Sequence, residues 1–280
     1  ISKVTDDIIK EVAPEVSREY VPHAVDNNIF KPLSMEKITK VREDQLGPVD
    51  SEKVIFFWNN RNARRKQSGS LLFWFKKFLD KVGHDKAQLI MHTNPKDPHG
   101  QDLNQISDFL GLNSQNQLLF SVEKLSKEDL AVIYNMVDCT INISDAEGFG
   151  LATLESLSCG TPIIANMTGG LQEQIRSGSD LFGIPLFPES KAVIGSQDIP
   201  YIYEDRVSES QVVSALEKMY AMTREERREM GLRGREHVLN NFGFENFSKQ
   251  WVERMIRFHE EEGSWETRKQ YNGIRFLEVA

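Results

Sequence analysis

Two glutamates bracket a short glycine-rich segment in the middle of the chain. Glu147 precedes Gly-Phe-Gly-Leu at 148–151, and Glu155 follows Glu147 with seven residues between them. The glycines allow a tight turn, and the pattern after Gly150 predicts a helix whose first amides have no partner inside the helix. Such an amino terminus binds anions, and carboxylates accept hydrogen bonds from hydroxyl groups. The segment predicts a site for a phosphate with sugar or ribose hydroxyls beside it. Two solvated helix-end glutamates are the simpler alternative.

Four basic residues follow the first apolar run of the chain. Arg61, Arg64, Arg65 and Lys66 lie just beyond Val-Ile-Phe-Phe-Trp at 54–58. Cations there can neutralise a phosphate, but they can also form a solvated basic patch or a nucleic-acid contact. The formal net charge of −8 opposes general nucleic-acid binding, because that needs many uncompensated Lys and Arg residues. Their place at the end of a strand, opposite the glycine-rich segment, favours the phosphate interpretation.

The chain between residues 53 and 166 alternates short apolar runs with helical patterns. This alternation predicts an α/β domain with a Rossmann-like parallel sheet and helices on both faces. Ligands of such sheets bind beyond the carboxyl ends of the strands, so the loops at those ends should share one rim. The expected strands are 54–58, 88–91, 117–121, 139–143 and 162–165, the expected helices are 71–82, 103–110, 127–137 and one after 150, and the rim loops lie at Asn59, His92, Val122, Ser144 and Asn166.

Both ends of the chain depart from this central pattern. Upstream, residues 4–12 predict a helix and residues 20–22 a short strand, and a polar stretch to Asp50 has the composition of a linker. Downstream, the end from Trp265 has an extended character, and the expected helices are 212–219, 224–230, 235–240 and 247–258. We divide the chain into 1–50, the tail of another domain plus a linker, 51–245, the central domain, and 246–280, a C-terminal helix and tail.

Composition argues against several classes of protein. The 280 residues contain no run of roughly 18 uncharged apolar residues and do not start with a signal peptide, which predicts a cytoplasmic protein. Cys139 and Cys159 lie in apolar segments and fit neither a disulfide framework nor a zinc site, so two buried thiols are expected. Neither a dinucleotide-binding G-x-G-x-x-G nor a P-loop is present, and there is no Asp-x-Asp pair to hold a divalent ion. We expect no metal and no cofactor.

Three landmarks together resemble one enzyme family. The stretch E-G-F-G-L-x-x-x-E-S-L-S-C-G-T-P-I-I at 147–164, with G-G-L-Q-E at 169–173, resembles the E-x7-E signature of the "group one" family of GT-B glycosyltransferases. The segment V-P-H-A-V-D at 21–26, followed by F-K-P, is similar to the interdomain segment of that family. Arg61-x4-Lys66 looks like its phosphate-binding Arg and Lys. The resemblance covers about residues 1 to 260 and implies the C-terminal, donor-binding half of a GT-B fold.

The resemblance implies a reaction and a set of catalytic residues. A glycosyl group would pass from a nucleoside diphosphate sugar to a hydroxyl acceptor with retention at the anomeric carbon. Arg61 and Lys66 would neutralise the diphosphate before and during its departure, and Glu147 would contact the transferred sugar near its reacting face. Because two cations and a helix terminus can replace a divalent ion at the leaving group, the transfer is expected to be metal-independent.

The donor-binding residues follow from the same resemblance. Backbone amides at the start of the helix would hold sugar hydroxyls and phosphate, Glu155 would bind ribose hydroxyls, and backbone at the head of another helix would meet the base edge. These donor-binding residues are Gly148, Phe149, Gly150, Leu151, Glu155, Lys124 and Leu125. The expected partners are a nucleotide-sugar donor and a hydroxyl acceptor, which could be a glycan, a lipid or a small molecule, and no nucleic acid. Most of the family's acceptor-binding domain is expected to be missing from these 280 residues, with a remnant in 1–50, so peripheral membrane contact would arise only through the missing half.

The sequence departs from the family pattern at three positions. Asn60, Gln67 and Ala24 replace glycines of the family motifs, and the first two leave open which cations between residues 61 and 66 reach the phosphates. A nucleotide-sugar-binding module without transferase activity is the alternative function, and an epimerase or phosphorylase on the same fold is a third. His92 and His99 lie in a rim loop. A polar surface loop is a simpler interpretation of this segment than a contact with the donor.

Overall fold

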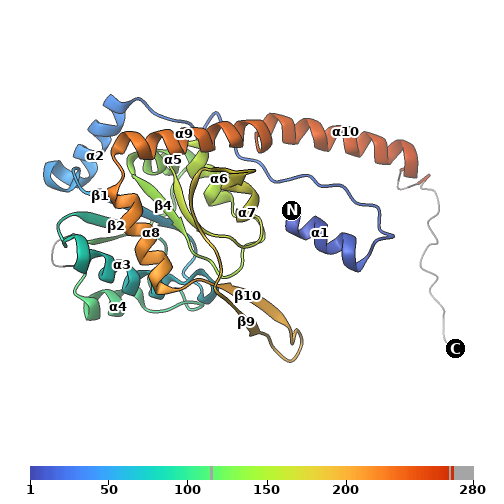
Figure 1. The fold of residues 1–280 in the computed structure, drawn as a ribbon. Helices are drawn as coiled ribbons and strands as arrows, with labels where there is room; N and C mark the ends of the chain where they lie inside the picture. The colour runs from blue at the N-terminus through green and yellow to red at the C-terminus, as the bar shows by residue number, and fades with distance from the viewer. Residues whose placement is uncertain (114–115, 265, 268–280) are drawn as a thin grey trace.

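The computed structural model describes residues 1–113, 116–264 and 266–267. Its centre is a six-stranded sheet in the order β3-β2-β1-β4-β5-β8, in which all neighbours pair in parallel. Figure 1 shows this sheet lying between two groups of helices. With the first strand central, the order is that of a Rossmann-like sheet, so the predicted fold class is confirmed. The strands are β1 (Val54–Asn59), β2 (Ala87–His92), β3 (Leu118–Ser121), β4 (Cys139–Asn142), β5 (Ile163–Asn166) and β8 (Gly183–Leu186).

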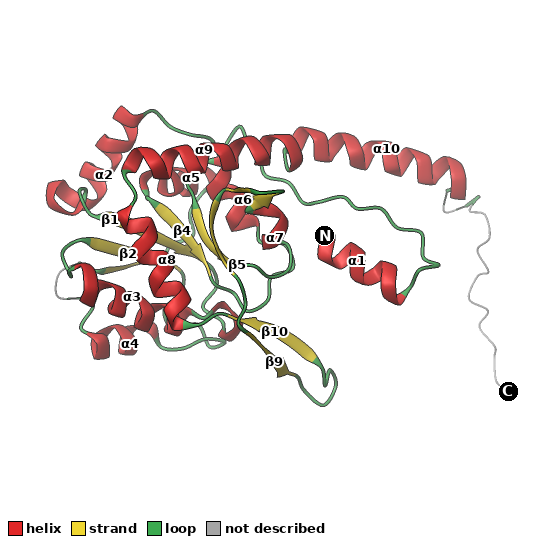
Figure 2. Ribbon diagram, viewed as in Figure 1, coloured by secondary structure: helices red, strands yellow, loops and turns green. Residues whose placement is uncertain are grey.

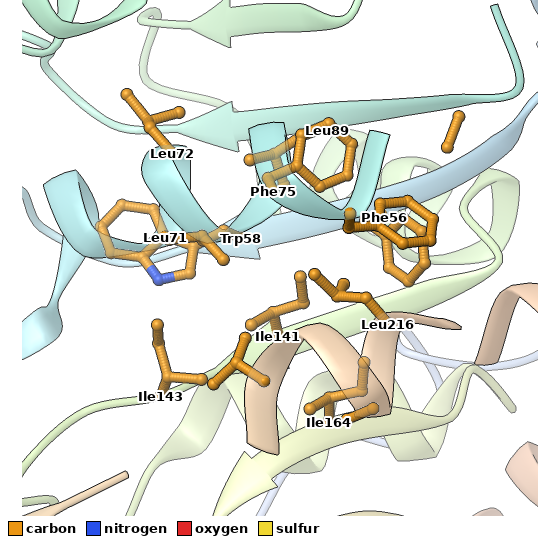
Figure 3. Packing of buried hydrophobic residues seen from close by; sticks show 14 of the residues in the cluster. Phe56, Trp58, Leu71, Leu72, Phe75, Leu89, Ile141, Ile143, Ile164 and Leu216 are labelled. Carbon is orange, nitrogen blue, oxygen red and sulfur yellow. The ribbon is translucent and has the colours of Figure 1, made fainter. Parts of the chain in front are cut away.

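Strand β1 divides the interior into two hydrophobic cores. Phe56 and Trp58 point to one face of the sheet, and Ile55 and Phe57 to the other, because alternate side chains of a strand face opposite ways. All four are fully buried, which explains why β1 is a continuous apolar run. Figure 3 shows Phe56 and Trp58 packed with Phe75 and with residues of neighbouring strands and helices.

The helices cover both faces of the sheet. Residues of α3 (Ser68–Val82), α4 (Leu103–Leu110) and α8 (Glu209–Ala221) pack in the core with Phe56, whereas α5 (Lys127–Met136), α6 (Leu151–Ser158), α7 (Leu171–Gln174) and α9 (Arg224–Asn241) contribute to the core with Phe57. Polar N-cap side chains determine where several helices begin. At the start of α5, the Ser126 side chain accepts a hydrogen bond from the Asp129 amide at 3.0 Å. Strands β1 to β5 and helices α3 to α6 agree with the prediction to within a few residues at each end, whereas β8 and α7 were not predicted.

A buried ion network joins the amino ends of β1 and β4 to two outer helices. Asp138, just before β4, accepts hydrogen bonds at Oδ2 from Arg42 Nη1 at 2.9 Å and from the Ile55 amide at 2.9 Å. Its Oδ1 accepts from Arg227 Nη2 at 3.2 Å. Arg42 belongs to α2 (Met35–Asp50) and Arg227 to α9, so one carboxylate holds both helices to the sheet.

The amino-terminal region lacks one predicted strand and contains one helix that was not predicted. Helix α1 (Lys3–Val12) is confirmed, but the strand predicted for residues 20–22 is wrong, because that segment is extended chain without a strand partner. Pro22 has no amide to donate to a ladder. The stretch up to Asp50, predicted as a linker, contains α2 (Met35–Asp50), which starts at a Ser34 cap and kinks at Gly47 (φ +78°).

The carboxyl-terminal region contains fewer and longer helices than predicted. Residues 224–241 form the single helix α9 instead of two helices, and α10 (Phe244–Glu262) follows it. In Figure 1, α10 extends beyond the sheet, and none of its residues is buried. The extended end expected from Trp265 falls largely outside the described residues. Among the helices that are described, none is long and apolar enough to cross a membrane.

Two small hairpins between β5 and α8 were not predicted. One pairs β6 (Arg176–Ser177) with β7 (Asp180–Leu181), and the other pairs β9 (Ser190–Ile194) with β10 (Ile202–Arg206). Figure 2 shows the β9–β10 hairpin projecting away from the body of the domain. Its far part exposes large side chains, with Tyr201 76% and Tyr203 64% exposed. Because the hairpin has no buried apolar face, its sequence lacks the clear apolar alternation that would predict it.

Candidate functional site

The glycine-rich turn after β4 shapes the centre of the rim. Gly150 adopts φ +92° and precedes α6 without a side-chain cap. The first backbone amides of this helix can therefore donate hydrogen bonds to a ligand. Gly169 packs against the same turn, where an added Cβ would lie 1.7 Å from the Glu147 carbonyl oxygen. The Gly170 amide donates to that carbonyl at 3.3 Å. The glycines at 169 and 170 therefore hold the Glu147 loop in place by backbone contact.

Lys66 and Glu147 form a partly buried ion pair at this turn. Lys66 ends the short 3-10 helix η1 (Arg64–Lys66) and donates Nζ to Glu147 Oε2, although the two residues are 81 positions apart. Their side chains are 9% and 13% exposed, and Arg65 Nη1 lies 3.6 Å from the same oxygen. Burial lowers the pKa of Lys66, and the carboxylate of Glu147 opposes that shift. Because β1 and β4 are neighbours in the sheet, the loops that follow them meet here.

Glu155 is held inside the domain by a hydrogen-bonded chain. Its Oε2 accepts from the Tyr134 hydroxyl at 2.9 Å, and that hydroxyl accepts from Asn59 Nδ2 at 2.8 Å. Burial raises the pKa of Glu155 above its usual value, and burial also raises the pKa of Tyr134. A solvated helix-end glutamate is therefore the wrong description of Glu155. Tyr134 was not predicted as a site residue, because no motif surrounds this helix tyrosine three residues before Val137.

Arg61 lies apart from the Lys66–Glu147 pair, in a hollow over β1, β2 and β3. Arg61 donates Nε to Asp97 Oδ2 at 2.7 Å and Nη2 to Asp97 Oδ1 at 3.1 Å, and His99 Nδ1 is 2.7 Å from Nη2. The hollow has a volume of about 540 Å³, and its lining includes Lys124 and His92. Arg61 is 59% exposed at its side chain, so a ligand in the hollow could reach it.

The histidines of this rim differ in their surroundings. His92 Nδ1 lies 2.9 Å from Ser121 Oγ, and burial lowers the pKa of His92. His99 is 67% exposed at its side chain and lies 3.1 Å from Asp97 Oδ1 through Nδ1. The interpretation as a polar surface loop therefore describes His99 but not His92, which is half-buried at the end of β2.

The remaining predicted donor-binding residues differ in whether their side chains are exposed. The Phe149 side chain is 5% exposed and contacts the rings of His23 and Phe242, with centroids 5.0 and 6.0 Å away. Only its backbone can therefore face a ligand. Leu151 is 48% exposed in the first turn of α6. Leu125 is half-buried in the loop before α5, beside the exposed Lys124.

Two buried acidic residues of the site region were not predicted from the sequence. Asp145 lies two positions before Glu147 and is 1% exposed, and Glu204 of β10 is 3% exposed. Glu204 binds Arg64 through both carboxylate oxygens, at 2.8 and 2.6 Å. Asp145 could have been suspected from its place in the glycine-rich loop, whereas Glu204 lies outside every motif. The cations of 61–66 thus have different partners: Asp97 for Arg61, Glu204 for Arg64 and Glu147 for Lys66.

Two further features bear on metals and thiols. Within the parts of the chain that the structure describes, no group of three or more His, Cys, Asp or Glu side chains could hold a metal ion. Cys139 and Cys159 are both free and buried, as predicted, and burial raises the pKa of each thiol. Neither thiol is therefore suited to act as a nucleophile.

Comparison with known proteins identifies the family. Residues 41–235, more than half of the chain, match the model of the family described as glycosyl transferases group 1. The chain belongs to this family. Its Rossmann-like domain with a glycine-rich turn at the rim is thus a glycosyltransferase domain of the GT-B class, as the E-x7-E resemblance implied.

Relatives and solved structures agree with this assignment. The chain is 26% identical over 184 residues to N-acetyl-alpha-D-glucosaminyl L-malate synthase of Bacillus anthracis, which covers 64% of this chain and 44% of the relative. In fold it is similar to sucrose-phosphate synthase of Thermosynechococcus elongatus, with a TM-score of 0.72, 20% identity, and coverage of 93% and 58%. It is also similar to Anabaena HepE in complex with UDP-glucose, with a TM-score of 0.69, 17% identity, and coverage of 91% and 62%. The chain spans about half the length of the curated relatives it matches.

Proposed function

We propose that this chain is the donor-binding part of a retaining glycosyltransferase that moves a hexosyl group from a nucleoside diphosphate sugar to a hydroxyl acceptor without a metal ion. The observation that carries the proposal is the buried Lys66–Glu147 pair beside the uncapped amino terminus of α6. It puts one cation, one carboxylate and a set of free amides within a single turn of the rim. Membership of the glycosyltransferase family supports the reaction type.

The proposed chemistry depends on charge at the leaving group. As the bond between the anomeric carbon and the diphosphate oxygen breaks, negative charge grows on the diphosphate, and Lys66 together with the α6 amides stabilises it. The acceptor oxygen then bonds to the anomeric carbon on the same face, and the departing diphosphate oxygen takes the acceptor proton. Glu147 accepts hydrogen bonds from the transferred sugar, and the contact with Lys66 holds its carboxylate in place. Little acid–base chemistry is required of the side chains themselves.

The hollow at β1–β3 suits the nucleoside part of the donor. It opens at the carboxyl ends of the strands, where ligands of such sheets bind, and Lys124 lies at its edge. Anabaena HepE, which shares the fold, was solved with UDP-glucose. We therefore take UDP as the first probe.

The first prediction concerns binding of the diphosphate. We expect UDP to bind the chain in the presence of EDTA, and Lys66→Ala to weaken that binding by about 1.5–3 kcal/mol, the usual size of a hydrogen bond to a charged group. Titration calorimetry measures both. Lys81→Ala, at an exposed ion pair on α3, is the matched control and should leave affinity unchanged. Absence of binding at millimolar UDP, or binding only with a divalent ion, would count against the proposal.

The second prediction concerns the ribose. Glu155→Gln should weaken UDP binding by about 1.5–3 kcal/mol, because a carboxylate that accepts from ribose hydroxyls is lost. The same variant should bind 2′,3′-dideoxy-UDP as the unmodified protein does, since that ligand has no hydroxyls to lose. Calorimetry with the two ligands gives the comparison. Equal losses for both would show that Glu155 acts through Tyr134 on the fold and does not touch the ribose.

A further inference from the structure

The base of the β9–β10 hairpin inserts three charged residues into the rim. Glu204, Asp205 and Arg206 end β10, and Glu204 is 3% exposed, whereas Tyr201 and Tyr203 further along the hairpin are exposed. The hairpin therefore has an exposed far part and a buried, charged base. None of the motifs that mark the family contains this segment.

Glu204 fixes the loop that carries Lys66. It binds Arg64 Nη1 and Nη2 at 2.8 and 2.6 Å, and it accepts from Arg206 Nη2 at 3.0 Å. Arg64 starts the 3-10 helix that ends at Lys66. A bidentate arginine–carboxylate pair constrains both distance and orientation, so this pair determines where η1 lies.

Arg206 and Asp145 extend the network to the Glu147 loop. Arg206 Nη1 lies 2.7 Å from Asp145 Oδ2, which also accepts from Gln67 Nε2 at 2.6 Å. The Asp145 amide donates to the Arg65 carbonyl at 2.8 Å, and the Asp145 carbonyl accepts from the Asp205 amide at 2.8 Å. The hairpin base is thus bonded to both loops that form the Lys66–Glu147 pair.

The positive and negative charges in this network balance, which limits how readily Arg64 can bind a phosphate. Two carboxylates, Asp145 and Glu204, face two guanidinium groups, Arg64 and Arg206, and both carboxylates are buried. Release of Arg64, whose side chain is 57% exposed, would leave the buried Glu204 with Arg206 as its remaining cation. The bidentate pair with Glu204 competes with a phosphate for Arg64, whereas Lys66 and Arg65 lie beside Glu147.

We propose that Glu204 is a positioning residue for diphosphate binding, which holds Arg64 away from the phosphate and sets Lys66 against Glu147 through the hairpin base. The inference rests on the proposed function, because it assigns a role at the same donor site. Glu204 acts through Arg64 and the η1 loop and does not itself touch the ligand. The hairpin base is then part of the donor site although it lies outside the E-x7-E segment.

The test is a double-mutant cycle on UDP affinity. Glu204→Gln should raise the dissociation constant for UDP at least tenfold, and Arg64→Gln should do the same, because each breaks the contact that positions η1. In a Lys66→Ala background Glu204→Gln should change the constant less than twofold, since the side chain that Glu204 positions is gone. Glu209→Gln, at an exposed ion pair with Lys77 just after the hairpin, is the control and should leave affinity unchanged. Thermal melting of each variant confirms that it is folded.

The outcomes separate this inference from the proposed function. Failure of the unmodified chain to bind UDP overturns the proposed function. If UDP binds but Glu204→Gln leaves the affinity unchanged, or weakens it equally with and without Lys66, the positioning role is overturned. A loss with Arg64→Gln but not with Glu204→Gln would show that Arg64 contacts the phosphate directly. If Glu204→Gln does not fold, Arg64→Gln is compared with and without Lys66→Ala. A loss of UDP affinity that disappears in the Lys66→Ala background supports the positioning role, and a loss that persists overturns it.

Discussion

The 280-residue chain by itself is expected to bind UDP but to transfer sugar at least about 10⁵-fold more slowly than a two-domain glycosyltransferase, the lower end of what alignment of two reactants can supply. All the site residues described here lie along the rim of one sheet. Among the described residues, the proposal assigns those on this rim to the donor and none of them to an acceptor hydroxyl. Without that alignment the bound donor can react only with whatever nucleophile reaches it from solution.

Exposed apolar faces support this expectation. Helix α10 carries Trp251, Met255 and Ile256 at 44%, 65% and 55% exposure, and α1 carries Ile8 at 54%. Apolar surface gathered on one side of a domain marks a contact with another protein surface. These helices extend beyond the sheet (Figure 1), where a second domain could cover them.

The measurement is release of UDP from UDP-glucose and other UDP sugars. The 280-residue chain and the product of the complete reading frame that contains it are assayed side by side, each with a set of hydroxyl acceptors. Transfer by the 280 residues at an enzyme-like rate of about 1 per second would contradict the prediction. Binding without transfer by both proteins would favour the nucleotide-sugar-binding module over the transferase.

Asp138→Ala is expected to lower the free energy of unfolding by about 3–5 kcal/mol, the usual cost of removing one partner from a buried ion pair. The carboxylate accepts hydrogen bonds from Arg42, Arg227 and the Ile55 amide, and its side chain is 4% exposed. Its removal leaves two buried arginines without their counter-ion. Urea unfolding measures the change as a shift of the midpoint at constant slope.

The control for this variant is Asp80→Ala on α3. Asp80 pairs with Lys76 and His84 at the surface, and its side chain is 49% exposed, so its loss should cost no more than about 1 kcal/mol. UDP affinity of folded Asp138→Ala should be unchanged, because Asp138 precedes β4 at the edge of the sheet opposite the rim. Equal losses of stability in the two variants would refute the role of Asp138.

The sequence alone predicted five of the six strands of the sheet and the edge at which ligands of such sheets bind. Buried parallel strands must be apolar on both faces, so the run at 54–58 predicted β1, and the helix at 103–110 was predicted with the bounds that α4 has. The predictions of secondary structure were wrong in segments that bury little apolar surface. The extended segment at 20–22 has β-type residues but no neighbouring strand, and the β9–β10 hairpin has no buried apolar face. Helix α2 was missed because its sequence is polar and contains Gly47 and Pro48.

The tertiary structure decided which residue of each motif meets which partner. Glu147 and Glu155 could be selected from residue type and spacing, because carboxylates beside an anion-binding helix terminus can accept hydrogen bonds from sugar hydroxyls. Arg61 and Lys66 were selected from the neighbouring cations by the family resemblance. Their pairing could not be predicted, since Lys66–Glu147 and Arg64–Glu204 join positions 81 and 140 residues apart. Such contacts depend on the order of strands in the sheet and on where an unforeseen hairpin folds back. A linear sequence states which charges exist, and only the packing of β1 beside β4, with β10 laid across their loops, determines which of them remain free to bind a ligand.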